Sequence, residues 1–143
     1  VRSKEEADHS LPYMIAVAVL DGRVMPDQYR LERIHCDDVQ ALLRKITIRP
    51  LDAYSQRFPD QMPCRITVSL SDGRVVGKEK QDYEGFHTRP MRWETVVQKF
   101  ERLSSPYTDA PLRLKIIDAV ADMDSIQIAY LMSLLAKVQI SAW

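Results

Sequence analysis

Residues 8–22 read DHSLPYMIAVAVLDG, a polar start followed by an apolar run and a final Asp-Gly. Asp8 or Ser10 can cap the beginning of a helix, and Gly22 is typical of the position just past a helix end. The apolar run between them leaves no polar face, which is the pattern of a fully buried helix. Because a chain of 143 residues has few places to bury a helix completely, we expect the helix over 8–21 to lie inside something larger.

The composition is that of an ordinary globular domain. Lys and Arg number 20, as do Asp and Glu, so the formal net charge is zero. This balance argues against nucleic acid or an anionic membrane as the main partner. No apolar run reaches the ~18 residues that a membrane-spanning helix needs, and the charged N-terminus lacks the apolar core of a secretory signal. We therefore expect a cytoplasmic protein, or one of the mitochondrial matrix in a eukaryote.

The two cysteines, Cys36 and Cys64, are too few for a disulfide framework, and we expect free thiols. Cys36 lies in the run His35-Cys36-Asp37-Asp38, whose residue types can ligate metals. Four consecutive residues cannot all converge on one ion, and the paired spacings of metal sites are missing. We expect no metal site, and we interpret His35 as a structural or solvated side chain.

The rest of the chain mixes strand and helix patterns. Apolar residues at every second position over 64–70 indicate a strand, and the Ser-Asp-Gly that follows indicates a hairpin turn. We expect strands over 47–50, 64–70 and 74–83, a helix from Asp37 or Asp38 to about Lys45, and helices over 92–103, 111–122 and 124–138. The fold class is α+β: a small, mainly antiparallel sheet of about three strands with helices on one face, flanked by apolar helices that belong to a larger helical domain.

Four segments carry a family resemblance. They are DHSLPYMIAVAVLDGRV at 8–24, DDVQALLRKI at 37–46, RITVSLSDG at 65–73, and GFHTRPMRW at 85–93 followed by Lys99-Phe100. In this order they resemble the C-terminal part of the MmgE/PrpD family, over residues 5–121. Because full members are much longer, the resemblance implies three parts: 1–22 as a helix of the large helical domain, 23–110 as a small α+β domain, and 111–143 as C-terminal helices that pack back on the helical domain.

The family includes 2-methylcitrate dehydratase, cis-aconitate decarboxylase and iminodisuccinate epimerase. The resemblance implies a cofactor-independent lyase, foremost a 2-methylcitrate dehydratase of propionate catabolism that removes water to give 2-methyl-cis-aconitate. The decarboxylase and the epimerase are the alternatives within the family. The implied partners are a small di- or tricarboxylate, the missing N-terminal helical domain and a second copy in a homodimer. Catalysis in the family comes mainly from the helical domain, so we expect this chain alone to be inactive.

His9, between Asp8 and Ser10 at the expected helix start, is the best catalytic candidate. A helix N-terminus favours anions, which suits carboxylate substrates, and it would lower the pKa of His9 and favour a neutral, basic imidazole. The alternative is that Asp8 and Ser10 only cap the helix while His9 packs locally. Tyr13 is a weaker substrate-binding candidate, because a buried tyrosine usually finds one hydrogen-bond partner.

His87 and Arg89, in the loop after Gly85, are the second candidate pair for substrate binding. Arg offers a two-pronged donor that suits a carboxylate. The alternative is a surface loop in which Arg89 pairs with a nearby acid. No nucleophile elbow, phosphate loop or dinucleotide motif appears in the sequence. A different class of function also stays open, a non-catalytic binding or oligomerisation module whose apolar ends form the interface.

Overall fold

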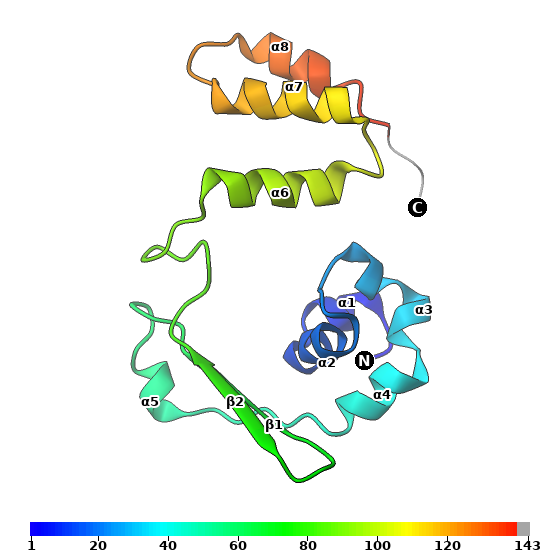
Figure 1. The fold of residues 1–143 in the computed structure, drawn as a ribbon, viewed down its shortest axis with the longest axis vertical. Coiled ribbons are helices and arrows are strands. Elements are labelled where there is room, and N and C mark those ends of the chain that lie inside the picture. The colour runs from blue at the N-terminus through cyan, green and yellow to red at the C-terminus, as the bar shows by residue number, and fades with distance from the viewer. Residues whose placement is uncertain (140–143) are drawn as a thin grey trace. The chain divides into compact units, whose positions relative to one another are not determined.

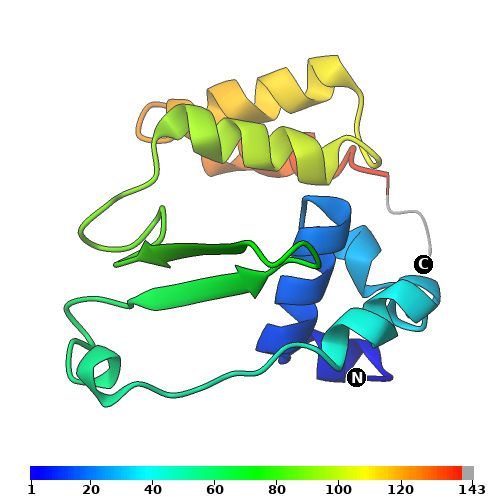
Figure 2. The ribbon, with the colours of Figure 1, turned by 60° about the horizontal axis from the view of Figure 1, so that its bottom comes forward.

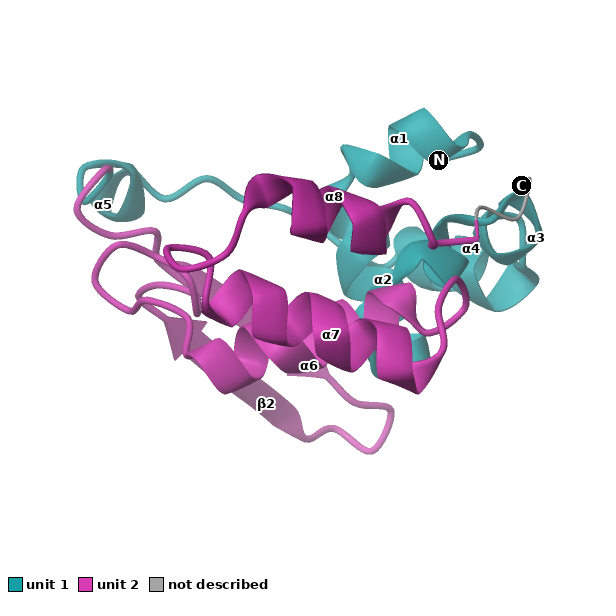
Figure 3. Cartoon of the chain, turned by 90° about the horizontal axis from the view of Figure 1, so that it is seen from above, with its two compact units in different colours: residues 1–58 teal, residues 59–143 magenta. Residues whose placement is uncertain are grey.

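The computed structural model describes residues 1–139. The chain divides into two compact units, Val1–Phe58 and Pro59–Trp143, coloured separately in Figure 3. Each unit is described by itself. The assignment of 1–22 and 111–143 to a larger helical domain stays a prediction, and its last residues, 140–143, lie outside the described part.

The first unit is helical (Figure 1). Its elements are α1 (Lys4–Asp8), α2 (Leu11–Asp21), the 3₁₀ turn η1 (Pro26–Tyr29), α3 (Leu31–Ile34), α4 (Asp37–Leu43) and α5 (Asp52–Ser55). The expected helix over 37–45 is confirmed as α4, which ends two residues earlier than predicted. The one-turn helix α5 lies in a stretch for which no helix was expected.

The capping signals around α2 are confirmed, with one correction to its start. The Ser10 hydroxyl accepts a hydrogen bond from the Tyr13 amide at 3.2 Å, and Gly22 adopts the left-handed conformation with φ 70°. The predicted start at residue 8 is wrong, because Asp8 is the last residue of α1, a separate short helix. Ser10 is therefore the cap, and Asp8 is not.

The apolar side chains of α2 divide between a buried and an exposed side. Tyr13 and Val17 are fully buried in a core that they share with Ala7, Ile34 and Val39. The other side of α2 is open, with Leu11 and Val19 exposed, and Leu20 in its last turn is exposed as well. A helix that is apolar all round is therefore only half covered within the described residues. That a further partner covers it stays a prediction.

The second unit begins with a β-hairpin of β1 (Cys64–Ser69) and β2 (Val75–Lys80), drawn as two antiparallel arrows in Figure 2. The register pairs Cys64 with Lys80 and Ser69 with Val75, and Gly73 turns the chain with φ 86°. The strand predicted from the alternating apolar residues over 64–70 is present, but both strands are largely exposed, and only Val68 is partly buried. The sheet of residues 1–139 has two strands, not three.

The missing strand is the one expected over 47–50, which is irregular. A strand exists only where another backbone accepts and donates its ladder hydrogen bonds, and Pro50 removes one donor. The α+β class is confirmed with this smaller sheet.

Three helices complete the second unit: α6 (Trp93–Ser104), α7 (Ala110–Ala121) and α8 (Ile128–Leu135). Asp109 caps α7 by accepting a hydrogen bond from the Leu112 amide at 2.8 Å. The last helix is shorter than the predicted 124–138, because residues 122–125 form a turn first. The core of this unit lies between α7 and α8 and contains Ile116, Ala119, Leu131 and Leu134. No helix within residues 1–139 is long and apolar enough to cross a membrane.

Candidate functional site

His9 lies between two helix ends. It follows the last residue of α1 and precedes Ser10, the cap of α2. Its Nδ1 is 2.9 Å from the Glu5 carbonyl oxygen, which can only accept, so Nδ1 carries the proton and donates. In the neutral ring Nε2 is then left with a free lone pair on an exposed side chain. The local structure thus fixes the tautomer that a general base would need.

The helix N-terminus beside His9 is less open to an anion than the sequence indicates. Ser10 occupies the Tyr13 amide with its hydroxyl and the Met14 amide with its carbonyl at 3.0 Å, and Pro12 has no amide hydrogen. Within the described residues, the amide of Leu11 is the one first-turn donor to which no acceptor is assigned. The capping interpretation of Ser10 is therefore what the structure shows.

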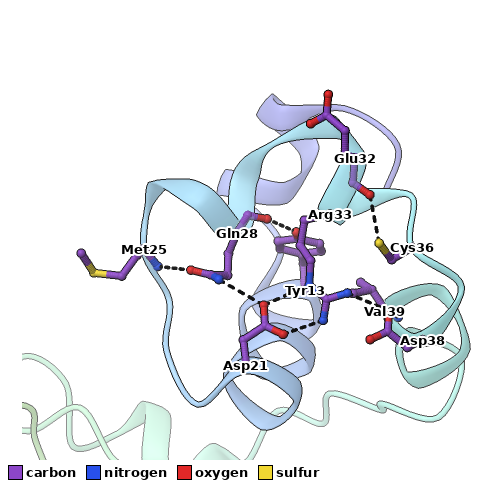
Figure 4. Close-up of polar contacts among 9 residues, drawn as sticks. All are labelled: Tyr13, Asp21, Met25, Gln28, Glu32, Arg33, Cys36, Asp38 and Val39. Atoms are coloured by element: carbon purple, nitrogen blue, oxygen red, sulfur yellow. Dashed lines mark hydrogen bonds and ion pairs between the residues drawn. The ribbon is translucent and has the colours of Figure 1, made fainter. Parts of the chain in front are cut away.

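Tyr13 is held by a buried hydrogen bond. Its hydroxyl donates to the backbone carbonyl of Gln28 (Figure 4). Its ring also contacts that of Tyr29, with the ring centroids 5.8 Å apart. Burial raises the pKa of Tyr13 above its ordinary value. In this arrangement the hydroxyl already has a protein acceptor, so Tyr13 positions the end of η1 against α2.

Asp21 and Arg33 form a two-pronged ion pair in the first unit. Arg33 Nε lies 3.0 Å from Asp21 Oδ2, and Arg33 Nη2 lies 2.6 Å from Asp21 Oδ1. Arg33 also donates from Nη1 to Asp38 Oδ1 at 2.7 Å, so one guanidinium joins the end of α2 to the start of α4 (Figure 4). Hydrogen bonding from Arg33 lowers the pKa of both carboxyls, and Asp21 foremost raises the pKa of Arg33.

Gln28 completes this network and is buried. Its side-chain nitrogen donates to Asp21 Oδ2 at 3.1 Å, and its side-chain oxygen accepts the Met25 amide at 3.0 Å. The sequence patterns did not indicate the network of Asp21, Gln28, Arg33 and Asp38. The acids directly after Cys36 were one available signal, but the pairing of Arg33 with Asp21 spans 12 residues and follows no local rule.

His87 and Arg89 lie on a tight turn. The Arg89 amide donates to the Phe86 carbonyl at 2.8 Å, and the Gly85 amide donates to the Arg89 carbonyl at 2.8 Å. Phe86 is buried and its ring lies 4.3 Å from that of His87, centroid to centroid. The turn thus anchors an apolar side chain and leaves both His87 and Arg89 exposed.

Arg89 pairs with an acid, as the simpler interpretation of this loop predicted. Its Nε lies 3.3 Å from Asp82 Oδ1, and Thr88 donates to Asp82 Oδ2 at 3.2 Å. The pair orients the guanidinium through Nε alone, and the side chain remains 45% exposed. A carboxylate ligand can still approach the Nη nitrogens, which are the outer prongs of the group.

The candidates fall in separate units. Asp8, His9, Ser10 and Tyr13 belong to the first unit, while His87 and Arg89 belong to the second. Their meeting in one substrate site stays a prediction. Within residues 1–139 no three His, Cys, Asp or Glu side chains gather in a way that could hold a metal ion.

The comparison with known protein families identifies the family to which the chain belongs. Residues 1–124 match the model of the MmgE/PrpD C-terminal domain, and the chain belongs to this family. It is similar to the cis-aconitate decarboxylase of Mus musculus, with 25% identity over 103 residues that cover 72% of this chain and 21% of that protein. It is also similar to the cis-aconitate decarboxylase of Homo sapiens, with 23% identity over 141 residues that cover 94% of this chain and 28% of that protein. The chain thus spans about a quarter of the length of these relatives.

Proposed function

We propose that this chain is the C-terminal portion of a cofactor-independent lyase that acts on a small di- or tricarboxylate. We propose further that its reaction is loss of water from 2-methylcitrate to give 2-methyl-cis-aconitate, in the cytoplasm or the mitochondrial matrix. The observation that carries the lyase proposal is the family match over residues 1–124. Two features support this chemistry: His9 has a fixed tautomer that leaves Nε2 able to accept a proton, and the guanidinium of Arg89 is exposed enough to bind a carboxylate.

The proposed dehydration needs three kinds of group. A base removes a carbon-bound proton, the C=C bond forms as the C–O bond breaks, and an acid protonates the leaving hydroxyl to water. Cations stabilise the enolate-like charge that develops next to the carboxylate. In this proposal His9 Nε2 is the base, while Arg89 and His87 hold a carboxylate. The acid and the remaining cations come from the missing N-terminal helical domain, so the isolated chain is inactive.

A second candidate reaction is the decarboxylation of cis-aconitate, because the two similar proteins described above are both cis-aconitate decarboxylases. Here a C–C bond breaks, the electron pair stays on carbon and a proton is delivered there. No acid for a leaving hydroxyl is needed. The same carboxylate contacts by His87 and Arg89 would serve both reactions. The two therefore differ in what the helical domain supplies.

The test begins with the reading frame upstream of Val1. If it encodes a long helical domain, that domain is co-expressed with this chain, and the complex is assayed on 2-methylcitrate by ultraviolet absorbance of the product and on cis-aconitate by release of CO₂. We expect no turnover by the chain alone and turnover by the complex. Turnover by the chain alone would overturn the shared active site, and no turnover of either substrate by the folded complex would overturn the lyase proposal.

Variants of the complex separate binding from chemistry. His9→Gln should lower kcat by about 100-fold or more if His9 is the base, and Arg89→Gln should act mainly on KM. His35→Gln is the matched control, because His35 is also exposed and its Nε2 is held by the Arg2 carbonyl at 2.9 Å. Equal losses in His9→Gln and His35→Gln would remove His9 from the mechanism.

A further inference from the structure

The loop between β2 and α6 contains a turn that closes through its own backbone. The Gly85 amide donates to the Arg89 carbonyl and the Arg89 amide donates to the Phe86 carbonyl, so Phe86 and Arg89 pair across a two-residue turn. Phe86 is buried, and its ring lies 5.2 Å from that of Tyr83, centroid to centroid. Backbone pairing and this apolar anchor are therefore sufficient to explain the shape of the turn.

Asp82 lies beside the turn and contacts it with both carboxylate oxygens. Its Oδ1 is 3.3 Å from Arg89 Nε, and its Oδ2 accepts a hydrogen bond from the Thr88 hydroxyl at 3.2 Å. The side chains of Asp82 and Arg89 are 26% and 45% exposed. Ion pairs with such exposure contribute little to stability. The pair is therefore better suited to orienting the guanidinium than to stabilising the fold.

The contact with Asp82 determines which part of Arg89 is open to a ligand. The Nε side of the guanidinium faces Asp82, which leaves the end formed by Nη1 and Nη2. A carboxylate can bind this end with one oxygen on each Nη nitrogen. An arginine side chain that moves freely loses rotamer freedom when a ligand immobilises it, and that loss weakens binding. A side chain that Asp82 already holds loses less.

We propose that Asp82 is a positioning residue, which holds Arg89 ready for end-on binding of a substrate carboxylate. This inference rests on the proposed function, because it takes Arg89 as a carboxylate-binding residue. Asp82 acts through Arg89 and does not contact the substrate, whose negative charge would repel it. Thr88 supports this role, because its hydroxyl fixes the second oxygen of Asp82.

The first test uses the full chain without substrate. NMR gives the heteronuclear NOE of the Arg89 Nε–Hε group, which is high for an immobilised side chain. We expect a high value in the wild type and a clear drop in Asp82→Ala, with the amide signal of Gly85 unchanged because the turn persists. The matched control is Asp72→Ala, since Asp72 Oδ2 lies 2.7 Å from Arg74 Nε in the hairpin turn. This control should release Arg74 and leave Arg89 unchanged.

An equal NOE of Arg89 in the wild type and in Asp82→Ala would overturn the proposal. So would a drop of the same size in Asp72→Ala, because the effect would then not come from the contact with Asp82.

The second test uses the complex with the N-terminal domain. Asp82→Ala should raise KM about three- to tenfold, the range expected for one immobilised side chain, and leave kcat unchanged. In an Arg89→Gln background the same substitution should have no further effect, because Asp82 acts through Arg89. Additive losses, or a fall in kcat alone, would overturn the positioning role. If the folded complex turns over neither substrate, the lyase proposal fails and the substrate role of Arg89 fails with it, whereas the NOE comparison still decides whether Asp82 orients Arg89.

Discussion

Replacing Asp21 by Asn should destabilise the first unit by about 1–2 kcal/mol at neutral pH. In the wild type both Asp21 oxygens accept from Arg33, at 2.6 and 3.0 Å, and Oδ2 also accepts from Gln28 at 3.1 Å. Asn offers one oxygen, and its amide hydrogens then face donors of Arg33 or Gln28. Hydrogen bonds to charged groups contribute about 1.5–3 kcal/mol. The side chains of Arg33 and Asp21 are 21% and 18% exposed, so partial screening favours the lower part of that range.

The same substitution at Asp27 provides the matched control. Asp27 pairs with Arg30 at 3.1 Å on the same unit, but the two side chains are 59% and 61% exposed. Exposed pairs of this kind contribute between about 0 and 0.5 kcal/mol. The measurement is a urea titration followed by NMR of the Val17 and Ile34 methyl groups, which lie in the core of the first unit. Asp21→Asn should lower the midpoint by about 1 M for a slope near 1–2 kcal/mol/M, and Asp27→Asn should not.

The effect should also depend on pH in a defined direction. Because Arg33 lowers the pKa of Asp21, the folded unit keeps the carboxylate ionised where the unfolded chain takes up a proton. This contribution is complete above the ordinary Asp value of 3.8 and disappears as the pH falls through the lower folded-state pKa. The gap between wild type and Asp21→Asn should close in that window. Two results would refute the assignment of this stability to the Asp21–Arg33 pair. One is equal destabilisation by Asp21→Asn and Asp27→Asn, and the other is a stability difference between wild type and Asp21→Asn that stays constant on acidification.

Three further substitutions test the contacts around α2 by the same titration. Tyr13→Phe should cost about 1–2 kcal/mol, because the Gln28 carbonyl loses its donor, whereas Tyr29→Phe should cost clearly less if the hydroxyl of Tyr13 is the one that matters. Ser10→Ala should cost about 1 kcal/mol if the hydroxyl caps the Tyr13 amide, and an unchanged midpoint would show that it does not. Gly22→Ala should cost about 1 kcal/mol, because a side chain is strained at φ 70° although no atom lies within 4 Å of the added Cβ.

Local rules predicted the helix ends well. Ser10 and Gly22 occupy the caps that their residue types indicated, because a cap depends on atoms only two to four residues away. The hairpin turn at Gly73 follows for the same reason. Boundaries were less accurate where two signals adjoin. Asp8 and Ser10 are both good caps, and the sequence does not show that Asp8 instead ends a preceding helix.

Contacts between distant segments were not predictable. The expected strand over 47–50 has suitable residues, but whether a ladder partner exists is decided elsewhere in the chain. Arg33 pairs with Asp21 across the turn of η1, and nothing in the residues between them indicates that pairing. For the candidate site, the roles of His9 and Arg89 stay predictions. The simpler alternatives, Ser10 as a cap and Arg89 paired with a nearby acid, are the contacts that the structure shows, although the sequence did not indicate that the acid is Asp82.

The open side of α2 connects the fold to the proposed chemistry. Leu11 is exposed on this helix and directly follows Ser10, so it lies two residues from His9. A domain that covers the exposed apolar side of α2 would therefore also remove water from the neighbourhood of His9 Nε2. Removal of water strengthens electrostatic interactions and protects a developing carbanion from solvent protons. In the lyase proposal, binding of the covering domain therefore does two things at once: it buries the apolar side of α2, and it makes His9 effective as a base. This explains why an apolar helix and a polar candidate residue adjoin in this segment.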